Sequence, residues 1–333
     1  MKTQLQLTLL PQHAGNEIEL RKFISQTLCC EKEDFVYRVV RKSIDARSRQ
    51  PRVNLSIEVF VGEQPPCLYE NEFLYKDISN AVQVVVVGAG PAGLFAALRL
   101  IELGYKPIVL ERGKNVSERK RDIALQNRNK AFNQESNYCF GEGGAGTFSD
   151  GKLYTRSKKR GNIRRILEIF HQHGAQDTIL YEAHPHIGTD RLPIVIQNIR
   201  KTIIECGGEY IFNAKVNDLL IEKDAVKGVK TEDGSTYFGE AVVLATGHSA
   251  RDIYALLQQK NIAIEAKGFA IGVRVEHPQA LIDQIQYHRK YRGEYLPAAS
   301  YNIVNQIDGR GVYSFCMCPG GHIVPASTES GAI

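Results

Sequence analysis

The sequence has no segment of the kind that carries a protein into or across a membrane. It contains no run of about 18 consecutive apolar residues, the length that a transmembrane helix needs. Its first residues, Met1 to Leu5, lack the apolar core of a signal peptide. The 7 cysteines are an odd number at irregular spacings, so no disulfide framework is indicated. We therefore expect a cytoplasmic protein with reduced thiols and no membrane partner.

Internal repeats, low-complexity tracts and a strong charge bias are also absent. The 42 Lys and Arg residues against 37 Asp and Glu residues give a net charge of +5, which is too mild to indicate a nucleic-acid partner by itself. A hydrophobic content of 43% and a charged content of 24% are typical of a globular protein. The 333 residues are enough for a large core and roughly two or three domains.

The strongest motif that is present is a complete βαβ fingerprint for binding a dinucleotide. Four valines, Val84 to Val87, predict a buried strand, and a helix is predicted over Pro91 to Leu103. Gly88 permits the tight turn, Gly90 lets a pyrophosphate approach the backbone, and Gly93 lets the helix pack closely on the strand. The phosphate-facing turn comprises Gly88, Ala89, Gly90, Pro91, Ala92 and Gly93.

An acidic residue completes this fingerprint. The apolar run Pro107 to Leu110 ends in Glu111, 23 residues after Gly88, and Arg112 follows. A carboxylate at this distance can accept hydrogen bonds from an adenosine ribose diol, and it would repel a 2′-phosphate, so we do not expect NADP in this pocket. The alternative, a glycine-rich turn in an ordinary βαβ unit, is weakened by the strand, the helix and the acid around it.

Residues 1–64 precede the nucleotide fold and predict a separate small α+β unit. Leu5 to Leu9 alternate apolar and polar residues as in a strand, and Asn16 can cap a following helix. Two further strands are predicted over Phe35 to Val40 and over Val53 to Val61. The order βαββ indicates half of a ferredoxin-like fold or a similar plait.

A basic segment begins within this unit, and a linker is predicted over residues 65–80. The segment could bind an anion or RNA, but residues 1–80 carry 11 basic and 11 acidic side chains. Because the unit is neutral, a solvated loop or an interdomain contact is favoured. The basic residues are Arg38, Arg41, Lys42, Arg47, Arg49 and Arg52, beside one acid, Asp45.

A second glycine-rich stretch lies in residues 81–160, the first part of the nucleotide-binding domain. Gly141 to Gly151 contains 5 glycines, which let the backbone lie flat against a ligand. No apolar strand precedes it, so it is not a second fingerprint. Its free amides suit a polar cofactor, and a flexible surface loop is the alternative. Between Lys152 and Arg165 lie 7 basic and no acidic residues, which could attract an anionic substrate or nicotinamide nucleotide, or begin a solvated helix.

Residues 161–208 predict a helical insertion. Helices are expected over Asn162 to Gly174 and, capped by Thr189 or Asp190, up to Cys206. His184 and His186 have a spacing that can chelate a metal on a strand. No cysteine or acid cluster completes such a site and Pro185 disrupts strand geometry, so we expect no metal.

Residues 209–250 predict a β-meander followed by a return strand, Ala241 to Leu244, that leads into Ala245-Thr246-Gly247. If this strand pairs beside Val84 to Val87, its end lies near the cofactor at the carboxyl edge of the sheet. The remaining segment, residues 251–333, predicts a helix around Asp252 to Leu257, a strand over Lys267 to Val275, a helix over Pro278 to Tyr287 and a strand over Gly311 to Met317.

The fingerprint, the meander that begins at Val216 and the Ala245-Thr246-Gly247 turn together resemble the two-dinucleotide-binding-fold flavoproteins. More narrowly, the chain resembles a bacterial family of FAD-dependent dehydrogenases, the NAD(P)/FAD-dependent oxidoreductases. The resemblance spans nearly the whole chain. It is carried by the segments Lys42–Arg47, Gly141–Leu153, His186–Asp190, Ala245–Asp252, Phe269–Pro278 and Cys316–Gly321.

This resemblance implies an α/β fold, in which a Rossmann-like FAD-binding domain carries an inserted α+β substrate domain and follows the small ferredoxin-like domain. It implies FAD as the tightly held ligand, with Glu111 at the adenosine ribose and the Val216 backbone at the adenine. Thr246 and Gly247 would pass the pyrophosphate. The residues implied to line the flavin side are Gly143, Gly144, Ala145, Gly146 and Thr147.

The resemblance also predicts that the chain is truncated at its C-terminus. Flavoproteins of this type carry a late Gly-Asp motif followed by a helix under the flavin, and neither follows Gly321. Residues 251–333 would then hold a substrate or cap domain and an incomplete C-terminal FAD-binding segment.

No residue can be assigned as catalytic from the sequence. Cys316 and Cys318 form a Cys-x-Cys pair that a strand would place on one face, which allows a redox role or two buried small residues. His248 follows the return strand and could meet substrate or cofactor, or act as a capping or solvated histidine.

The sequence therefore predicts an oxidoreductase in which bound flavin carries hydride or electrons to or from an unidentified small-molecule substrate. Since only one fingerprint is complete, NAD(P)H would bind transiently in the open cleft. The alternative is a flavin-dependent RNA-associated or tRNA-modifying protein that uses the basic stretches Arg38–Arg52 and Lys152–Arg165, which the neutral N-terminal unit disfavours. An NAD-binding dehydrogenase is disfavoured by the return strand and the long insertion. The oligomeric state is not predicted.

Overall fold

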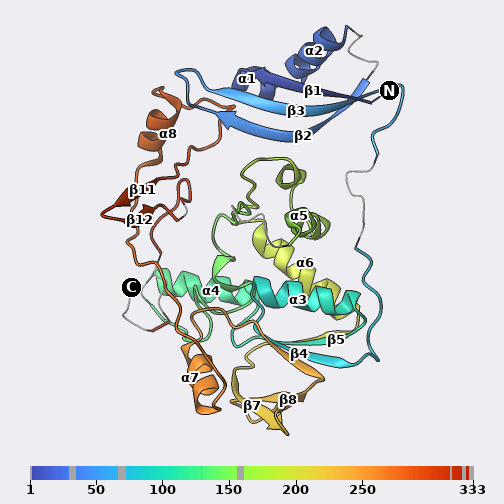
Figure 1. The fold of residues 1–333 in the computed structure, drawn as a ribbon, viewed down its shortest axis with the longest axis vertical. Coiled ribbons are helices and arrows are strands. Elements are labelled where there is room, and N and C mark those ends of the chain that lie inside the picture. Colours follow the sequence, from blue (N-terminus) through green and yellow to red (C-terminus); the bar gives the residue numbers. More distant parts are fainter. Residues whose placement is uncertain are drawn as a thin grey trace.

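The computed structural model describes residues 2–29, 35–66, 73–128, 130–155, 161–315, 317–324 and 328–329. An antiparallel sheet formed by the N-terminal residues stands at one end of the molecule, and a parallel sheet stands toward the other (Figure 1). Helices α5 (Ile163–Gln172) and α6 (Leu192–Glu205) lie between them. Within these described ranges, no helix is both long and apolar enough to cross a membrane.

The N-terminal sheet has the strand order β1-β3-β2, and both outer strands are antiparallel to β3. β1 and β2 are therefore parallel to each other with β3 between them, the split βαβ arrangement that the ferredoxin-like prediction requires. Asn16 caps α2 through its side chain, as its position predicts. The elements are β1 (Lys2–Leu9), α1 (Pro11–Gly15), α2 (Glu17–Leu28), β2 (Phe35–Asp45) and β3 (Arg52–Val61).

The parallel sheet has the order β10-β4-β5-β6. The predicted return strand pairs directly beside the fingerprint strand, with Ala241 opposite Val84 and Leu244 opposite Val87. This register brings the ends of both strands to the same edge of the sheet. The elements are β4 (Gln83–Val87), α3 (Pro91–Glu102), β5 (Lys106–Leu110), β6 (Glu209–Ile211) and β10 (Ala241–Leu244).

The two central strands of this sheet, β4 and β5, are buried on both faces, as a continuous apolar run in a parallel sheet predicts. Val86 contributes to a core shared with α3 and α6, whereas Val85 and Val87 contribute to a core on the opposite face. The second core is closed by an antiparallel meander and a helix: β7 (Val216–Glu222), β8 (Ala225–Thr231), β9 (Thr236–Phe238) and α7 (Arg251–Gln259).

Helix α4 (Val116–Asn127) was not predicted from the sequence. Its buried residues are Val116, Arg119 and Ile123, so a charged side chain occupies a position that an apolar residue normally holds. This interrupts the apolar period on which helix prediction depends. The long connection between β5 and β6 also contains the 3₁₀ turns η1 (Gly144–Gly146) and η2 (Asp177–Leu180).

Three predicted local features are wrong. Residues 267–275 form no strand, and Phe269, Ile271 and Val273 are exposed, because alternation alone does not supply the neighbouring strand that the backbone needs. The strand predicted up to Met317 ends at Tyr313 as β12 (Arg310–Tyr313), which pairs with β11 (Val304–Ile307). Arg191, not Thr189 or Asp190, is the N-cap of α6.

In the described residues, the N-terminal sheet contacts the rest of the chain at Lys42 and at Ile44. The backbone N–H of Lys42 donates to the Tyr181 carbonyl at 2.9 Å, and the Lys42 carbonyl accepts from Ala183 N–H at 2.9 Å. Elsewhere, Ile44 packs against the small core formed by α8 (Gln279–Tyr287) and the segment that follows it.

Candidate functional site

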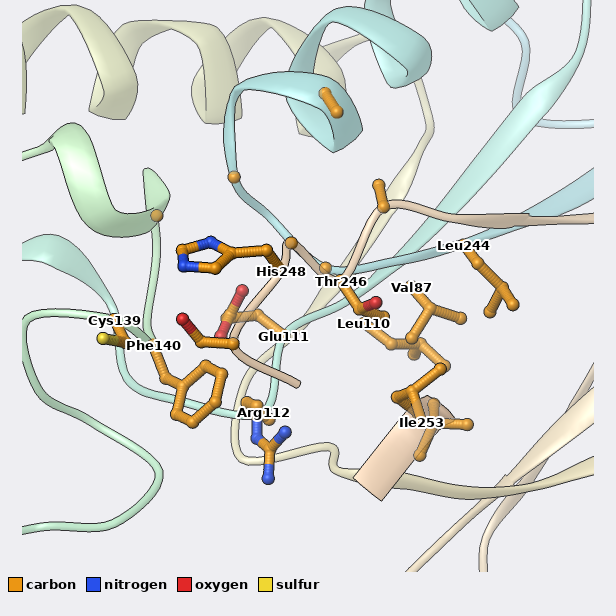
Figure 2. Close-up of a pocket in the computed structure, with 18 of the residues that line it drawn as sticks. Val87, Leu110, Glu111, Arg112, Cys139, Phe140, Leu244, Thr246, His248 and Ile253 are labelled. Carbon is orange, nitrogen blue, oxygen red and sulfur yellow. The ribbon is translucent and has the colours of Figure 1, made fainter. Parts of the chain in front are cut away.

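A cavity of about 650 Å³ opens where β4, β5 and β10 end. The last residues of these strands, Val87, Leu110 and Leu244, all line it (Figure 2). The carboxyl edge of a parallel sheet is where ligands bind in α/β folds, because the turns that leave the strands meet there. Around the strand ends the wall is completed by the fingerprint turn, the glycine-rich loop, the start of β7 and one face of α7.

The fingerprint glycines have the spatial roles that the sequence predicts. A Cβ added to Gly88, whose φ is +103°, would lie 2.5 Å from the Ala245 carbonyl oxygen. A Cβ on Gly93 would lie 1.8 Å from the Gly88 carbonyl oxygen, so no other residue lets α3 start here. Beside Gly90 the nearest atom to such a Cβ, the Gly144 Cα, is 3.8 Å away, which leaves room in the cavity for a ligand to approach the backbone.

Glu111 is buried and its carboxylate joins three segments of the site. Its Oε2 accepts a hydrogen bond from Ala89 N–H at 2.8 Å. Its Oε1 accepts from Gly113 N–H at 2.9 Å and from Gly141 N–H at 3.1 Å. A carboxylate has about four lone-pair positions, so roughly one remains for a ligand hydroxyl. Glu111 therefore fixes the fingerprint turn and the glycine-rich loop to the end of β5.

Arg112 forms part of the wall next to Glu111. Its guanidinium lies over the Phe140 ring, 4.2 Å from the centroid. It also forms an ion pair with Glu135 and a 3.1 Å ion pair with Asp252 of α7. Because three elements hold the guanidinium, it is a rigid part of the cavity wall.

The glycine-rich loop contributes Gly141, Gly144, Ala145 and Gly146 to the cavity lining. It is fastened to the fingerprint by Gly143 N–H, which donates to the Ala89 carbonyl at 2.8 Å. Below the loop lies Arg119 of α4, which is fully buried and bonds to several loop carbonyls.

Glu142 of the same loop is fully buried on the side away from the cavity. Its Oε2 accepts from Val116 N–H at 2.8 Å and from Arg200 Nη1 at 2.9 Å. Burial raises the pKa of the Glu142 carboxyl to about 7, although Arg200 and the Val116 N–H act to lower it. The neighbouring Tyr210 is also buried, and burial raises the pKa of its phenol.

The turn after the return strand also lines the cavity. Thr246, Gly247 and His248 form one side, and Figure 2 shows the His248 imidazole in the cavity whose wall includes Glu111. Cys318 is exposed, follows the end of β12 and does not line this cavity. Cys316, its predicted pair, lies outside the described residues.

The structure thus brings most of the predicted site residues together. The predicted residues that line the cavity are Gly88, Gly90, Pro91, Ala92, Glu111, Arg112, Gly144, Ala145, Gly146, Val216, Thr246, Gly247 and His248. The predicted residues that do not line the cavity are Ala89, Gly93, Gly143 and Thr147. Of these, Ala89 bonds to Glu111 and Thr147 bonds to Arg119.

Several lining residues were missed by sequence reasoning. Phe140 and Lys215 directly precede predicted positions and could have been found as their neighbours. Ile253, Tyr254 and Leu257 form one face of α7, at positions i, i+1 and i+4. Their role depends on how α7 packs, which the local sequence does not specify.

The two histidines with metal-binding spacing are not part of a metal-ligand cluster in the described residues. The His184 ring contacts the Tyr154 ring at a tilt of 52°, with ring centroids 4.4 Å apart, and His186 forms a β-bridge with Lys152. Over the ranges that the structure describes, no three His, Cys, Asp or Glu side chains are grouped as metal ligands.

Four family models match parts of the chain, two of them overlapping at residues 268–292. An FAD binding domain matches residues 81–129, which hold the fingerprint. Glucose inhibited division protein A matches residues 185–292, and the C-terminal domain-like family of FAD-dependent proteins matches residues 268–333. A domain of unknown function matches residues 1–60.

Three similar proteins extend these matches. A Clostridium beijerinckii protein described as "Uncharacterized protein" is 41% identical over 332 residues, covering 94% of this chain and 62% of its own length. The tRNA uridine 5-carboxymethylaminomethyl modification enzyme MnmG of Chlamydia abortus is 27% identical, covering 51% of this chain and 25% of its own length. Thiamine thiazole synthase of Aeropyrum pernix is 26% identical, covering 50% and 55%. The chain spans less than two thirds of each relative.

The fold and the site define a dinucleotide-binding flavoprotein. Its segments match models of FAD-binding and FAD-dependent proteins, and these matches support FAD as its cofactor.

Proposed function

We propose that the protein is an FAD-dependent dehydrogenase or reductase whose flavin exchanges hydride or electrons with a small-molecule substrate. The observation that carries this proposal is the single cavity at the carboxyl edge of the parallel sheet. It is lined at once by the fingerprint turn, the glycine-rich loop and the turn after the return strand. Three distant stretches that each suit a dinucleotide therefore meet in one site.

In this proposal, different residues of the chain contact different parts of the cofactor. Gly88 to Gly93 present the N-terminus of α3 to the pyrophosphate, where free N–H groups and the helix dipole favour a negative charge. Glu111 would accept a hydrogen bond from the adenosine ribose, and Arg112 and Val216 would hold the adenine. Thr246 and Gly247 would hold the pyrophosphate together with the fingerprint turn.

Gly144, Ala145 and Gly146 border the flavin half of the cofactor. FAD, when bound, supplies the hydride or electron chemistry of the reaction. His248 projects into the cavity and contacts cofactor or substrate. NAD(P)H is the proposed transient donor, and it binds in the open part of the cleft because the chain has one complete fingerprint.

Anaerobic reduction tests this function. Protein loaded with FAD is mixed with NADH or NADPH, and the loss of flavin absorbance is followed. We expect one of the two nicotinamides to reduce the bound flavin faster than it reduces free FAD. Bound FAD that neither nicotinamide reduces faster than free FAD would contradict the proposed donor.

A matched pair of glycine substitutions tests the placement of the cofactor. Gly90→Val fills the space beside the fingerprint turn, and we expect it to weaken FAD binding about tenfold or more. Gly268→Val is the control, because no atom lies within 4 Å of a Cβ at that position. Equal FAD affinities for the two variants would contradict the placement.

A second candidate function, RNA association, is favoured by the similarity to an enzyme named for tRNA modification. Arg41, Arg49 and Arg52 are exposed, whereas Arg38 and Lys42 are paired with Glu58 and Glu182. A gel-shift with bulk tRNA at physiological salt tests it. A shift that is lost in the R41A/R49A/R52A variant would support this function, and no shift would eliminate it.

A further inference from the structure

Arg119 is the largest side chain that is fully buried in the described part of the chain. It projects from the first half of α4 toward the glycine-rich loop. Its Nε donates to the Asn137 carbonyl at 2.9 Å, and its Nη2 donates to the Tyr138 carbonyl at 3.2 Å. Its Nη1 donates to the Glu142 carbonyl at 2.7 Å. One guanidinium therefore bonds both to the residues that lead into the glycine-rich loop and to the first half of the loop itself.

Every hydrogen-bond acceptor of Arg119 that the structure shows is uncharged. The remaining two are the Gly141 carbonyl at 3.2 Å and the Thr147 hydroxyl at 3.0 Å from Nη1. Glu111 and Glu142 are close enough to favour its charge, but neither forms an ion pair with it. Burial therefore lowers the pKa of the guanidinium to about 10, and it stays protonated at neutral pH.

A buried charge without an ion pair is costly, and the geometry shows what this one achieves. A Cβ on Gly141, where φ is +109°, would lie 2.5 Å from the Arg119 Cδ, so the loop backbone closes directly on the side chain. Nη1 of Arg119 donates to the Glu142 carbonyl. The N–H of the same peptide group, which belongs to Gly143, donates to the Ala89 carbonyl. Arg119 thus holds the loop in the orientation that joins it to the fingerprint turn.

This orientation shapes the cavity. With Gly143 fastened to Ala89, the next three residues, Gly144 to Gly146, line the cavity opposite Gly90. Arg119 itself does not line the cavity. It can act on a ligand only through the loop.

We propose that Arg119 is a positioning residue that sets the glycine-rich loop for the flavin half of FAD and is dispensable for the adenine half. The inference rests on the proposed function, in which the loop borders the flavin. In this proposal the adenine half is held by Glu111 and Arg112. Their partners Ala89, Gly113 and Asp252 lie outside the loop, and Glu111 shares only Gly141 with Arg119 in the described structure.

The test compares two ligands in calorimetric titrations. FAD contacts both halves of the site, whereas ADP occupies the adenine half alone. We expect Arg119→Met to weaken FAD binding about tenfold or more, in line with the loss of several hydrogen bonds from a charged donor, and ADP binding less than about threefold. Arg119→Lys should give an intermediate loss for FAD. Arg121→Met is the matched control, because Arg121 is exposed on the same helix and should leave both affinities unchanged.

The FAD-to-ADP ratio separates positioning from a general loss of structure. Equal losses for both ligands, or no loss for FAD, would overturn the inference. Wild-type protein that binds ADP and not FAD would also overturn it, whereas wild-type protein that binds neither would overturn the proposed function. If the Arg119 variants do not fold, Thr147→Val removes one loop partner of the guanidinium. Unchanged FAD affinity in that variant would then count against the proposal.

Discussion

At the scale of single residues, Glu111 shows how one side chain supports both fold and binding. The sequence predicts its position from the distance to Gly88, but not that three backbone N–H groups would take most of its acceptor positions. These donors belong to segments up to 30 residues away in the chain. Their convergence depends on the tertiary fold, so a local motif does not reveal it.

Replacing Glu111 by Gln tests this dual role. The amide keeps the size but turns an NH₂ group toward backbone N–H donors, so at least one bond is lost. We expect a destabilisation of about 1–3 kcal/mol, measured by urea unfolding, and FAD binding weakened about tenfold. Glu222→Gln is the control on an exposed strand position. Wild-type stability and affinity in Glu111→Gln would show that the carboxylate has neither role.

Glu142 makes stability depend on pH. Its pKa in the folded protein, about 7, is above the ordinary value of 4.5. As pH rises, the unfolded chain loses this proton before the folded protein does. The contribution of the protonated Glu142 carboxyl to folding stability is therefore complete below about pH 4.5 and is lost as pH approaches 7. We expect the loss to reach a few kcal/mol at most.

Urea unfolding of the wild type and of Glu142→Gln at pH 5 and pH 7.5 measures this effect. The variant should lose less stability than the wild type between the two pH values, because Gln does not titrate. Other groups affect both proteins equally. The same pH dependence in both proteins would show that the pKa of the Glu142 carboxyl is not raised.

At the scale of elements, the sequence predicts those parts whose apolar period is complete. The strand over Val84 to Val87, the helix that starts at Pro91 and the return strand at Ala241 are all present. The first strand buries all four valines and the helix buries one apolar face, whereas the return strand is only partly buried. α4 is missed because Arg119 takes a core position. The strand predicted over residues 267–275 is wrong because the alternation has no neighbouring strand in the described structure.

Gly93 controls how α3 packs on β4. A Cβ there would lie 1.8 Å from the Gly88 carbonyl oxygen, which is backbone and cannot move without shifting the fingerprint turn. We expect Gly93→Ala to destabilise the protein by about 1–3 kcal/mol through overpacking and to weaken FAD binding as the turn shifts.

The control for this substitution is Gly268→Ala, since nothing lies within 4 Å of a Cβ there. Thermal unfolding and FAD titration of the two variants give the comparison. A Gly93→Ala protein as stable as Gly268→Ala would contradict the close approach of α3 to the turn.

At the scale of the whole molecule, the site exists because chain segments distant in sequence end at one edge of one sheet. β10 begins at Ala241, 154 residues after β4 ends at Val87, yet the carboxyl ends of β4, β5 and β10 border the same cavity. The sequence predicts that the cofactor lies at this edge, because a return strand that follows the insertion is expected to pair in parallel beside β4. It does not predict how α7 closes the cavity, because that depends on the packing of α7 on β7.

The most direct measurement of the central claim is a spectrophotometric FAD titration of the 333-residue chain, with ADP and FMN as competitors. The account predicts one FAD per chain, a shift of the flavin absorption bands on binding, displacement by ADP and no competition by FMN, which lacks the adenosine that Glu111 holds. A colourless protein that FAD does not reconstitute would contradict the account. FMN that competes as well as ADP would also contradict the account, because the adenosine half of the cofactor would then contribute nothing to binding.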